Sequence, residues 1–253
     1  MQAIITSRTN ARVKALRAAF EGRTGGIAAI EGEHLLLEAL RSNVQLQTVY
    51  LSEDARSFDL PIGTEIVYLA NDIFQSIAAT ENTQGIAATI AIPLHGLPTD
   101  PTLLLVADNL RDPGNMGTLI RSAEAFGVHA LLTTAGTVDP WNQKSIRASA
   151  GSIFRLPIVP TTVASLLQLK ASGIRLFAAV VHDARPAVTL DLSRPTAIII
   201  GNEGSGISRQ ILDLADERIT IPCPGQVESL NAAIAGSLLL YEASRQRSAV
   251  RNQ

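Results

Sequence analysis

The segment LLLVADNLRDPGNMGTLIRSAEAF, residues 103–126, decides the fold class of this chain. Its first part, Leu103–Ala107, is apolar throughout, which is typical of a strand buried on both faces. A polar turn follows, and Met116–Phe126 then has the apolar spacing of an amphipathic helix. We therefore predict a strand that leads through a loop into a helix, the repeating unit of parallel α/β sheets.

The sequence after residue 126 continues this alternation. Further strands are expected at Val128–Thr133, Arg175–Val181, Ala197–Ile200 and Arg218–Ile221. Helices are expected at Val163–Lys170 and Ser229–Arg247. Apolar strands separated by helices predict a parallel sheet that helices cover on both faces.

The sequence before this part predicts a second, smaller α/β domain. Its expected elements are helices at Glu33–Leu40 and Asp72–Ala79 and strands at Thr48–Leu51, Glu65–Leu69 and Gly85–Ile92. Pro93–Pro101 contains three prolines and one glycine, a composition typical of a linker. We place the domain boundary there, which divides the chain into residues 1–95 and 96–253.

Composition excludes several classes of protein. With 46% hydrophobic and 17% charged residues among 253, the chain is not of the disordered type. The single Cys223 allows no internal disulfide, and the four histidines match no metal-ligand spacing, so we expect no metal. The chain begins without a signal-peptide pattern and has no apolar run near the ~18 residues of a membrane span. We expect no membrane association and a cytoplasmic location.

A local basic patch stands out against the net charge of −2. Between Ser7 and Gly26 the cations are Arg8, Arg12, Lys14, Arg17 and Arg23, and the one acid is Glu21. Helical spacing of Val13, Leu16 and Phe20 predicts a helix that Thr9 or Asn10 caps. Two interpretations remain open: a solvated amphipathic helix, or an arm that contacts nucleic-acid phosphates.

Three predicted loops follow strands and are unusually polar or glycine-rich for their position. They are Asp108–Asn115, Ile200–Ile207 and Ile221–Asn231. Ligand sites of parallel α/β sheets gather at such loops. The second loop reads G-x-x-G-x-G, which is neither a dinucleotide fingerprint nor a phosphate-binding loop. Each loop alone also fits a plain turn with a helix cap.

Taken together, the three loops resemble the signature motifs of the SpoU/TrmH family of RNA 2′-O-methyltransferases. The matching residues are N-x-x-x-x-x-R from Asn115, G-x-E-G-x-G from Gly201, and I-P followed by S-L-N from Ile221. The block Ser145–Gly151 matches as well, and so does the smaller domain, through Glu31–Leu36 and Val49–Ser52. The smaller domain is similar to the RNA-binding domain of the rRNA-modifying branch.

The resemblance implies a trefoil-knotted parallel-sheet methyltransferase domain, a homodimer, and S-adenosylmethionine as cofactor. It implies that Gly201, Ile221 and Leu230 contact the cofactor. The implied catalytic residues are Asn115, Arg121, Glu203, Ser229 and Asn231. For RNA contact we expect Arg8, Arg12, Lys14, Arg17 and Arg147. The implied reaction is methyl transfer to a ribose 2′-hydroxyl of RNA, with rRNA favoured over tRNA.

Arg121 is the residue on which the implied mechanism depends. The family proposal makes its equivalent the general base, but a guanidinium stays protonated in proteins. We therefore expect Arg121 to stabilise the developing alkoxide as a fixed cation and to anchor the neighbouring phosphate. Glu203 is expected to hold Arg121 or the pocket loops in place.

Three rival functions stay open at this point. One is a knotted methyltransferase that modifies a base, which nucleoside digestion of the product would reveal. Another is a non-catalytic RNA-binding protein, and the set of polar residues argues against it. The third is a nicotinamide-dependent dehydrogenase, which the missing fingerprint disfavours.

Overall fold

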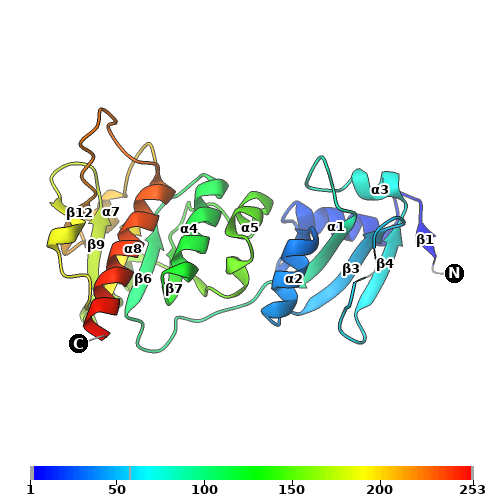
Figure 1. Cartoon of the computed structure of the whole chain (residues 1–253), viewed down its shortest axis with the longest axis horizontal. Coiled ribbons are helices and arrows are strands. Elements are labelled where there is room, and N and C mark those ends of the chain that lie inside the picture. Colours follow the sequence, from blue (N-terminus) through cyan, green and yellow to red (C-terminus); the bar gives the residue numbers. More distant parts are fainter. Residues whose placement is uncertain (1–2, 57, 252–253) are drawn as a thin grey trace. The chain divides into compact units, whose positions relative to one another are not determined.

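The computed structural model describes residues 3–56 and 58–251, whose helices and strands form two units (Figure 1). The first unit comprises Met1–Leu94 together with Trp141–Phe154. The second comprises His95–Pro140 together with Arg155–Gln253. A short segment within the predicted range 96–253 thus belongs to the first unit. The functional division into residues 1–95 and 96–253 stays a prediction.

The first unit contains a mixed five-stranded sheet in the order β1-β4-β3-β5-β2. Its strands are β1 (Ile4–Ile5), β2 (Ile27–Glu31), β3 (Leu46–Ser52), β4 (Glu65–Leu69) and β5 (Ile86–Ala91). β3 runs parallel to β4 and antiparallel to β5. The prediction missed β1 and β2, which is understandable for β2 because alanine, present at two of its five positions, has low strand propensity.

Helices of the first unit pack on this sheet, and apolar side chains of helices and strands together form the core of the unit. They are α1 (Ala11–Phe20), α2 (Glu33–Arg41), α3 (Asn71–Gln75) and α5 (Gln143–Ser149), with a 3₁₀ turn at Ser152–Phe154. Asn10 caps α1 as predicted, because its side chain accepts a 2.9 Å hydrogen bond from the Arg12 N–H. Val13 and Leu16 are fully buried. α5 is attached through Gln143, whose side-chain amide donates to the Ala29 carbonyl at 2.8 Å.

The second unit contains a seven-stranded sheet in the order β10-β12-β9-β11-β6-β7-β8. Its strands are β6 (Leu103–Ala107), β7 (Ala130–Thr133), β8 (Ile158–Pro160), β9 (Arg175–Ala179), β10 (Arg185–Pro186), β11 (Thr196–Ile200) and β12 (Glu217–Thr220). Every pairing in this sheet is parallel, which confirms the predicted architecture. The prediction missed only the short strands β8 and β10.

Helices lie on both faces of this sheet. They are α4 (Pro113–Ala125), α6 (Val163–Ala171), α7 (Arg209–Leu212) and α8 (Ala232–Arg251), with a 3₁₀ turn at Ala187–Thr189. α6 and α7 contribute Leu166 and Ile211 to the buried cluster on one face. On the other face α4 and α8 pack closely: a Cβ on Gly236 would lie 2.4 Å from the Leu119 side chain. Glycine at this position therefore lets the two helices approach closely, and any larger residue would displace the Leu119 side chain.

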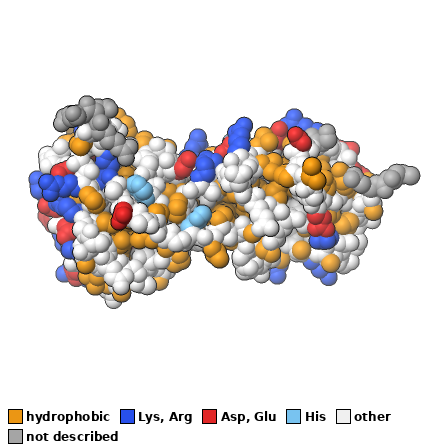
Figure 2. Space-filling view, turned by 90° about the horizontal axis from the view of Figure 1, so that it is seen from below, with side chains coloured by type: hydrophobic (Ala, Val, Ile, Leu, Met, Phe, Trp, Pro, Cys, Tyr) orange, Lys and Arg blue, Asp and Glu red, His pale blue; other side chains and the backbone are white. Residues whose placement is uncertain are grey.

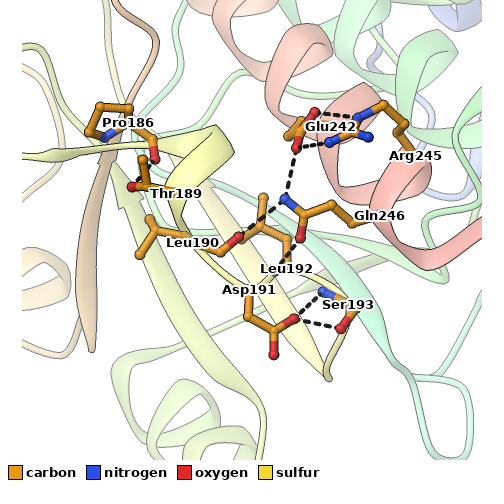
Figure 3. A network of polar contacts seen from close by, with 9 residues as sticks. All are labelled: Pro186, Thr189, Leu190, Asp191, Leu192, Ser193, Glu242, Arg245 and Gln246. Atoms are coloured by element: carbon orange, nitrogen blue, oxygen red, sulfur yellow. Dashed lines mark hydrogen bonds and ion pairs between the residues drawn. The ribbon is translucent and has the colours of Figure 1, made fainter. Parts of the chain in front are cut away.

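Polar contacts attach the C-terminal part of α8 to the segment before β11 (Figure 3). The Gln246 side chain accepts from the Leu192 N–H at 2.8 Å and donates to the Leu190 carbonyl at 3.1 Å. It also donates to Glu242 at 2.8 Å. Glu242 in turn accepts two hydrogen bonds from the Arg245 guanidinium, at 2.8 and 2.9 Å. These bonds from Arg245 hold the pKa of the Glu242 carboxyl below its usual value.

Two further expectations concern the whole chain. No helix among residues 3–56 and 58–251 has the length and hydropathy needed to span a bilayer. Strand order does not by itself define a knot, so the trefoil knot stays a prediction.

Candidate active site

The three polar loops leave strands of the parallel sheet at their carboxyl ends. Residues 108–112 follow β6, residues 201–208 follow β11, and residues 221–231 follow β12 and lead into α8 (Figure 1). β6 and β11 are neighbours, whereas β9 separates β11 from β12. Because carboxyl ends of parallel strands share one edge, the loops gather where ligand sites of such sheets form.

Three of the predicted catalytic residues form a hydrogen-bonded network. The Asn115 side-chain amide donates to the Glu203 carboxylate. The Asn231 amide donates to the Asn115 side-chain oxygen at 3.0 Å. Asn231 also caps α8, because its Oδ1 accepts from the N–H groups of Ala233 and Ile234 at 2.9 and 3.2 Å. The capping interpretation of Asn231 therefore holds, and its catalytic role stays a prediction.

Arg121 lies apart from this network. It is exposed on α4, and no hydrogen bond or ion pair joins it to another residue in the described part of the chain. The expectation that Glu203 holds Arg121 is therefore wrong for this chain by itself, because the partner of Glu203 is Asn115. The alternative, that Glu203 links the pocket loops, agrees with the structure.

A cavity of about 570 Å³ lies beside the network. Its wall includes Gly201, Ile221 and Leu230, the three predicted cofactor residues, and also Ser229. Glu203 and Asn231 are each within two positions of a lining residue in the sequence. Of the five predicted catalytic residues, Ser229 thus lines the wall, Asn231 and Glu203 are near lining residues in the sequence, and Asn115 is joined to both by hydrogen bonds. Arg121 has no such connection to the wall in the described residues.

The loop at Gly201 is folded on itself. Asn202 and Gly206 exchange two backbone hydrogen bonds of 3.0 and 2.9 Å. The Asn202 side chain accepts from the N–H groups of Gly204 and Ser205 at 2.9 and 3.0 Å. A Cβ on Gly201 would lie 2.4 Å from the Gly206 backbone carbon, so this position requires glycine. The absence of a side chain at Gly201 is therefore needed for the loop to close on itself. Close approach of a ligand is not the sole reason for a glycine here.

The loop of residues 222–230 is held differently. No backbone-to-backbone hydrogen bond is found for its N–H groups, although the structure describes every residue in it. Val227, Glu228 and Ser229 are exposed and line the cavity. Its N–H groups are thus available to hold a ligand.

A fourth loop completes the cavity wall and was missed from the sequence. It follows β9 and contributes Val181 and His182, and Pro186 of β10 lies beside them. The same rule that drew attention to the other loops could have found it, because Arg175–Val181 was predicted as a strand of the same sheet.

The cavity fits S-adenosylmethionine. Its volume is within the range of about 300–1,000 Å³ typical of small-molecule sites. Ile221, Leu230 and Leu239 offer apolar surface for an aromatic base, and the free N–H groups of residues 222–230 offer donors. No group of three or more histidine, cysteine, aspartate or glutamate side chains in residues 3–56 and 58–251 is arranged to hold a metal ion.

The predicted RNA-contacting cations divide into two kinds; lysine and arginine side chains at the surface are blue in Figure 2. Arg12 pairs with Glu65, so its charge is partly neutralised. Arg8, Lys14 and Arg17 have no acidic partner among the described residues, and the same holds for Arg147 on α5. These four belong to the first unit and are the cations with charge available for phosphates.

Comparison with known proteins agrees with this geometry. Residues 102–241 match the model of the SpoU rRNA Methylase family, and residues 10–88 match an MRM3-like substrate binding domain. The chain is 37% identical over 214 residues to a Bacillus subtilis protein, 23S rRNA (guanosine(2553)-2′-O)-methyltransferase RlmP. That match covers 84% of this chain and 86% of the relative.

Two solved structures are also similar. The SpoU methyltransferase AviRb of Streptomyces viridochromogenes, in complex with AdoMet, has a TM-score of 0.84 and 28% identity over 94% of this chain and 98% of its own. An AdoMet-bound rRNA methyltransferase of Sinorhizobium meliloti has a TM-score of 0.84 and 26% identity over 96% and 97%. With the family match spanning more than half of its residues, this chain belongs to the SpoU rRNA methylase family.

Proposed function

We propose that the chain transfers a methyl group from S-adenosylmethionine to a ribose 2′-hydroxyl of RNA, and that its substrate is rRNA. The observation that carries this proposal is the Glu203–Asn115–Asn231 network beside a cavity that fits the cofactor. The similarity to RlmP supports it, because that relative is a 23S rRNA 2′-O-methyltransferase by name.

The network positions the hydroxyl. S-adenosylmethionine supplies an electrophilic methyl group, so the protein has to place the oxygen in line and assist loss of its proton. Each amide has two N–H donors, and only one from Asn115 and one from Asn231 is used within the network. The remaining donors can orient the ribose, and Glu203 keeps the Asn115 amide from rotating.

Arg121 supplies positive charge in this proposal. Its guanidinium is exposed and has no acidic partner in the described residues, so it is available to a phosphate or to the developing alkoxide. Ser229 adds a hydroxyl on the cavity wall beside Leu230.

The preference for rRNA over tRNA rests on the first unit. Residues 10–88 resemble a substrate binding domain, and the RlmP match extends over most of both units. The unpaired cations Arg8, Lys14, Arg17 and Arg147 give that unit a means to hold phosphates. We infer a cytoplasmic location, because that is where an rRNA substrate is found.

A homodimer is supported by the outer face of α8. Ile234, Leu238 and Tyr241 follow at helical spacing on one face and are 52%, 44% and 53% exposed. A contiguous apolar stripe of this kind commonly marks a protein interface, and a two-fold interface would cover it with the same helix of a second copy. Light scattering should give a dimer mass, and Leu238→Glu should shift it toward the monomer.

The decisive experiment uses purified protein, radiolabelled S-adenosylmethionine, and separate pools of rRNA and tRNA. Digestion of the RNA to nucleosides should yield a 2′-O-methylated nucleoside from the rRNA pool. Label on a base would favour the base-modifying alternative, and label in tRNA alone would contradict the substrate class. Mapping 2′-O-methylation in a deletion strain would then identify the nucleotide.

A further inference from the structure

Asp108 is a buried carboxylate that the proposed chemistry does not use. It follows β6 directly and is 2% exposed. One carboxylate oxygen accepts from the Thr134 hydroxyl at 2.7 Å, and the other accepts from the Ser208 N–H at 2.6 Å. Its own N–H donates to the Ile200 carbonyl at 2.8 Å. A buried charge is costly unless it is paired or hydrogen-bonded, and these bonds offset that cost while they tie Asp108 to its neighbours.

These bonds connect three adjacent strands at the edge where the site lies. Ile200 ends β11, Asp108 follows β6, and Thr134 follows β7. Thr134 also accepts from the Asn109 N–H at 3.1 Å. The Asp108 side chain is therefore bonded to the end of the loop that contains Glu203, and its main chain begins the loop that leads to Asn115.

Each of these two loops is organised separately within itself. The Asp112 side chain accepts from the Asn115 N–H at 2.8 Å, and Asn202 closes the glycine-rich loop. Between the loops, the structure adds a 3.3 Å bond from the Asn202 side chain to the Asn109 carbonyl. The bond from the Ser208 N–H to the Asp108 carboxylate is the stronger connection, because hydrogen bonds to a carboxylate are roughly twice as strong as neutral ones. The bond from Thr134 holds the same carboxylate in place.

We infer that Asp108 is a positioning residue for methyl transfer: it fixes the glycine-rich loop against the loop of Asn115, so that Glu203 reaches the Asn115 amide. This inference rests on the proposed function. It assigns Asp108 no contact with RNA or cofactor. Loss of the carboxylate should therefore impair the chemical step more than cofactor binding.

The test compares Asp108→Ala with Asp216→Ala in the full-length protein. Asp216 also accepts a backbone N–H bond, from Leu176 at 2.8 Å, but it lies at the amino ends of the strands, away from the site. Asp108→Ala should lower the single-turnover methylation rate by about 100-fold, the effect of a misplacement near 1 Å. Its Kd for S-adenosylmethionine, measured by calorimetry, should change less than about threefold. A tenfold change in Kd would correspond to about 1.4 kcal/mol of binding free energy. Asp216→Ala should leave both values unchanged.

Conservative variants separate positioning from folding. In Asp108→Asn, the amide oxygen can still accept from Ser208 while the amide nitrogen donates to Thr134, so the rate should recover to within about tenfold of wild type. Should Asp108→Ala fail to fold, Thr134→Val removes one of the two bonds to the carboxylate, together with the acceptor of the Asn109 N–H. It should likewise lower the methylation rate more than the cofactor affinity. A wild-type rate in Asp108→Ala or Thr134→Val, or a rate and affinity that fall equally, overturns the inference.

A readout that does not need activity keeps this inference distinct from the proposed function. The side-chain amide resonance of Asn115 in an NMR spectrum reports its bond to Glu203. Asp108→Ala should shift this resonance toward its position in Glu203→Ala, and Asp216→Ala should leave it in place. An unmoved resonance overturns the inference even if the wild-type protein methylates RNA. If the resonance moves but wild type methylates no RNA, the proposed function alone fails.

Discussion

The glycine-rich loop and the loop before α8 border the same cavity but are held in different ways. Asn202 closes residues 202–206 with two backbone bonds and two side-chain bonds, and Asp108 attaches the end of that loop to the sheet. For residues 222–230 no comparable backbone hydrogen bonds are found, although all of them are described. The first loop is built before any ligand arrives, whereas the second has unpaired N–H groups that a ligand can use.

This difference suggests a division of work within the site. The prebuilt loop holds Glu203, whose partner Asn115 would need accurate placement in its proposed role of orienting the ribose. The loop before α8 contributes Ser229 and Leu230 to the cavity wall. Catalytic geometry would then depend on the first loop, and cofactor retention on both.

The largest effect should come from Arg121, which belongs to neither loop. Arg121→Ala should lower single-turnover methylation by about 100-fold or more while leaving cofactor affinity intact, because a fixed cation at the developing charge is removed. Arg121→Lys should keep measurable activity, since a point charge remains. If arginine were the base, the lysine variant would instead gain activity as pH rises toward its pKa of about 10. A near-normal rate in the alanine variant would make Arg121 structural.

Glu203 tests whether the prebuilt loop serves chemistry. Glu203→Ala removes a hydrogen bond between a carboxylate and the Asn115 amide, which should slow single-turnover methylation by about 10- to 100-fold. Glu203→Gln keeps an acceptor oxygen and should be affected less. Calorimetry should give a nearly unchanged S-adenosylmethionine Kd for both. A large loss of affinity with an unchanged rate would instead place Glu203 in cofactor binding.

A pair of glycine variants compares the two loops directly. Gly201→Ala places a Cβ 2.4 Å from the Gly206 backbone, so the glycine-rich loop must open. We expect cofactor affinity to fall about tenfold, equivalent to about 1.4 kcal/mol. Gly225→Ala meets nothing within 4 Å and should bind the cofactor as wild type does. Equal effects in the two variants would show that the loops are not held differently.

Substitutions in the first unit should have a smaller effect, and they should change only the affinity for RNA. Reversing the charges of Arg8, Lys14 and Arg17 should weaken RNA binding and reduce its salt dependence, by about 0.7–0.9 in log–log slope for each phosphate that the protein no longer neutralises. Arg12→Ala should matter less, because Glu65 already neutralises that cation. Filter binding across a salt series measures both. An unchanged slope in the triple variant would leave the arm without a role in RNA binding.

The smallest effect concerns Glu242, far along α8 from the site loops. Its folded-state pKa is lowered, chiefly by hydrogen bonds from Arg245, below the ordinary value of 4.5. Its contribution to stability is therefore present above about pH 4.5 and is lost as pH falls through the lowered pKa. Glu242→Gln should lower the Tm at pH 7, and the difference from wild type should shrink below pH 4.5. A difference independent of pH would show that the charge of Glu242 is not what stabilises α8.

Much of the architecture follows from local sequence. The apolar run Leu103–Ala107 predicts β6 with the bounds observed, and Glu65–Leu69 likewise predicts β4. These strands could be predicted because a short apolar or β-branched segment between turn residues has few ways to be buried other than as a strand. The order of the three loops was sufficient to indicate the family, and the family match agrees.

What sequence alone determined, then, is the parallel α/β sheet, the loops that border the site and the residue types in them. Only the tertiary structure decided which partners meet: Glu203 with Asn115 instead of Arg121, and Trp141–Phe154 with the first unit. Periodicity records whether a side chain faces a core or solvent, and it does so over a few neighbouring residues. A hydrogen bond such as that between residues 115 and 203 depends on how distant strands are ordered in the sheet, which no local pattern contains.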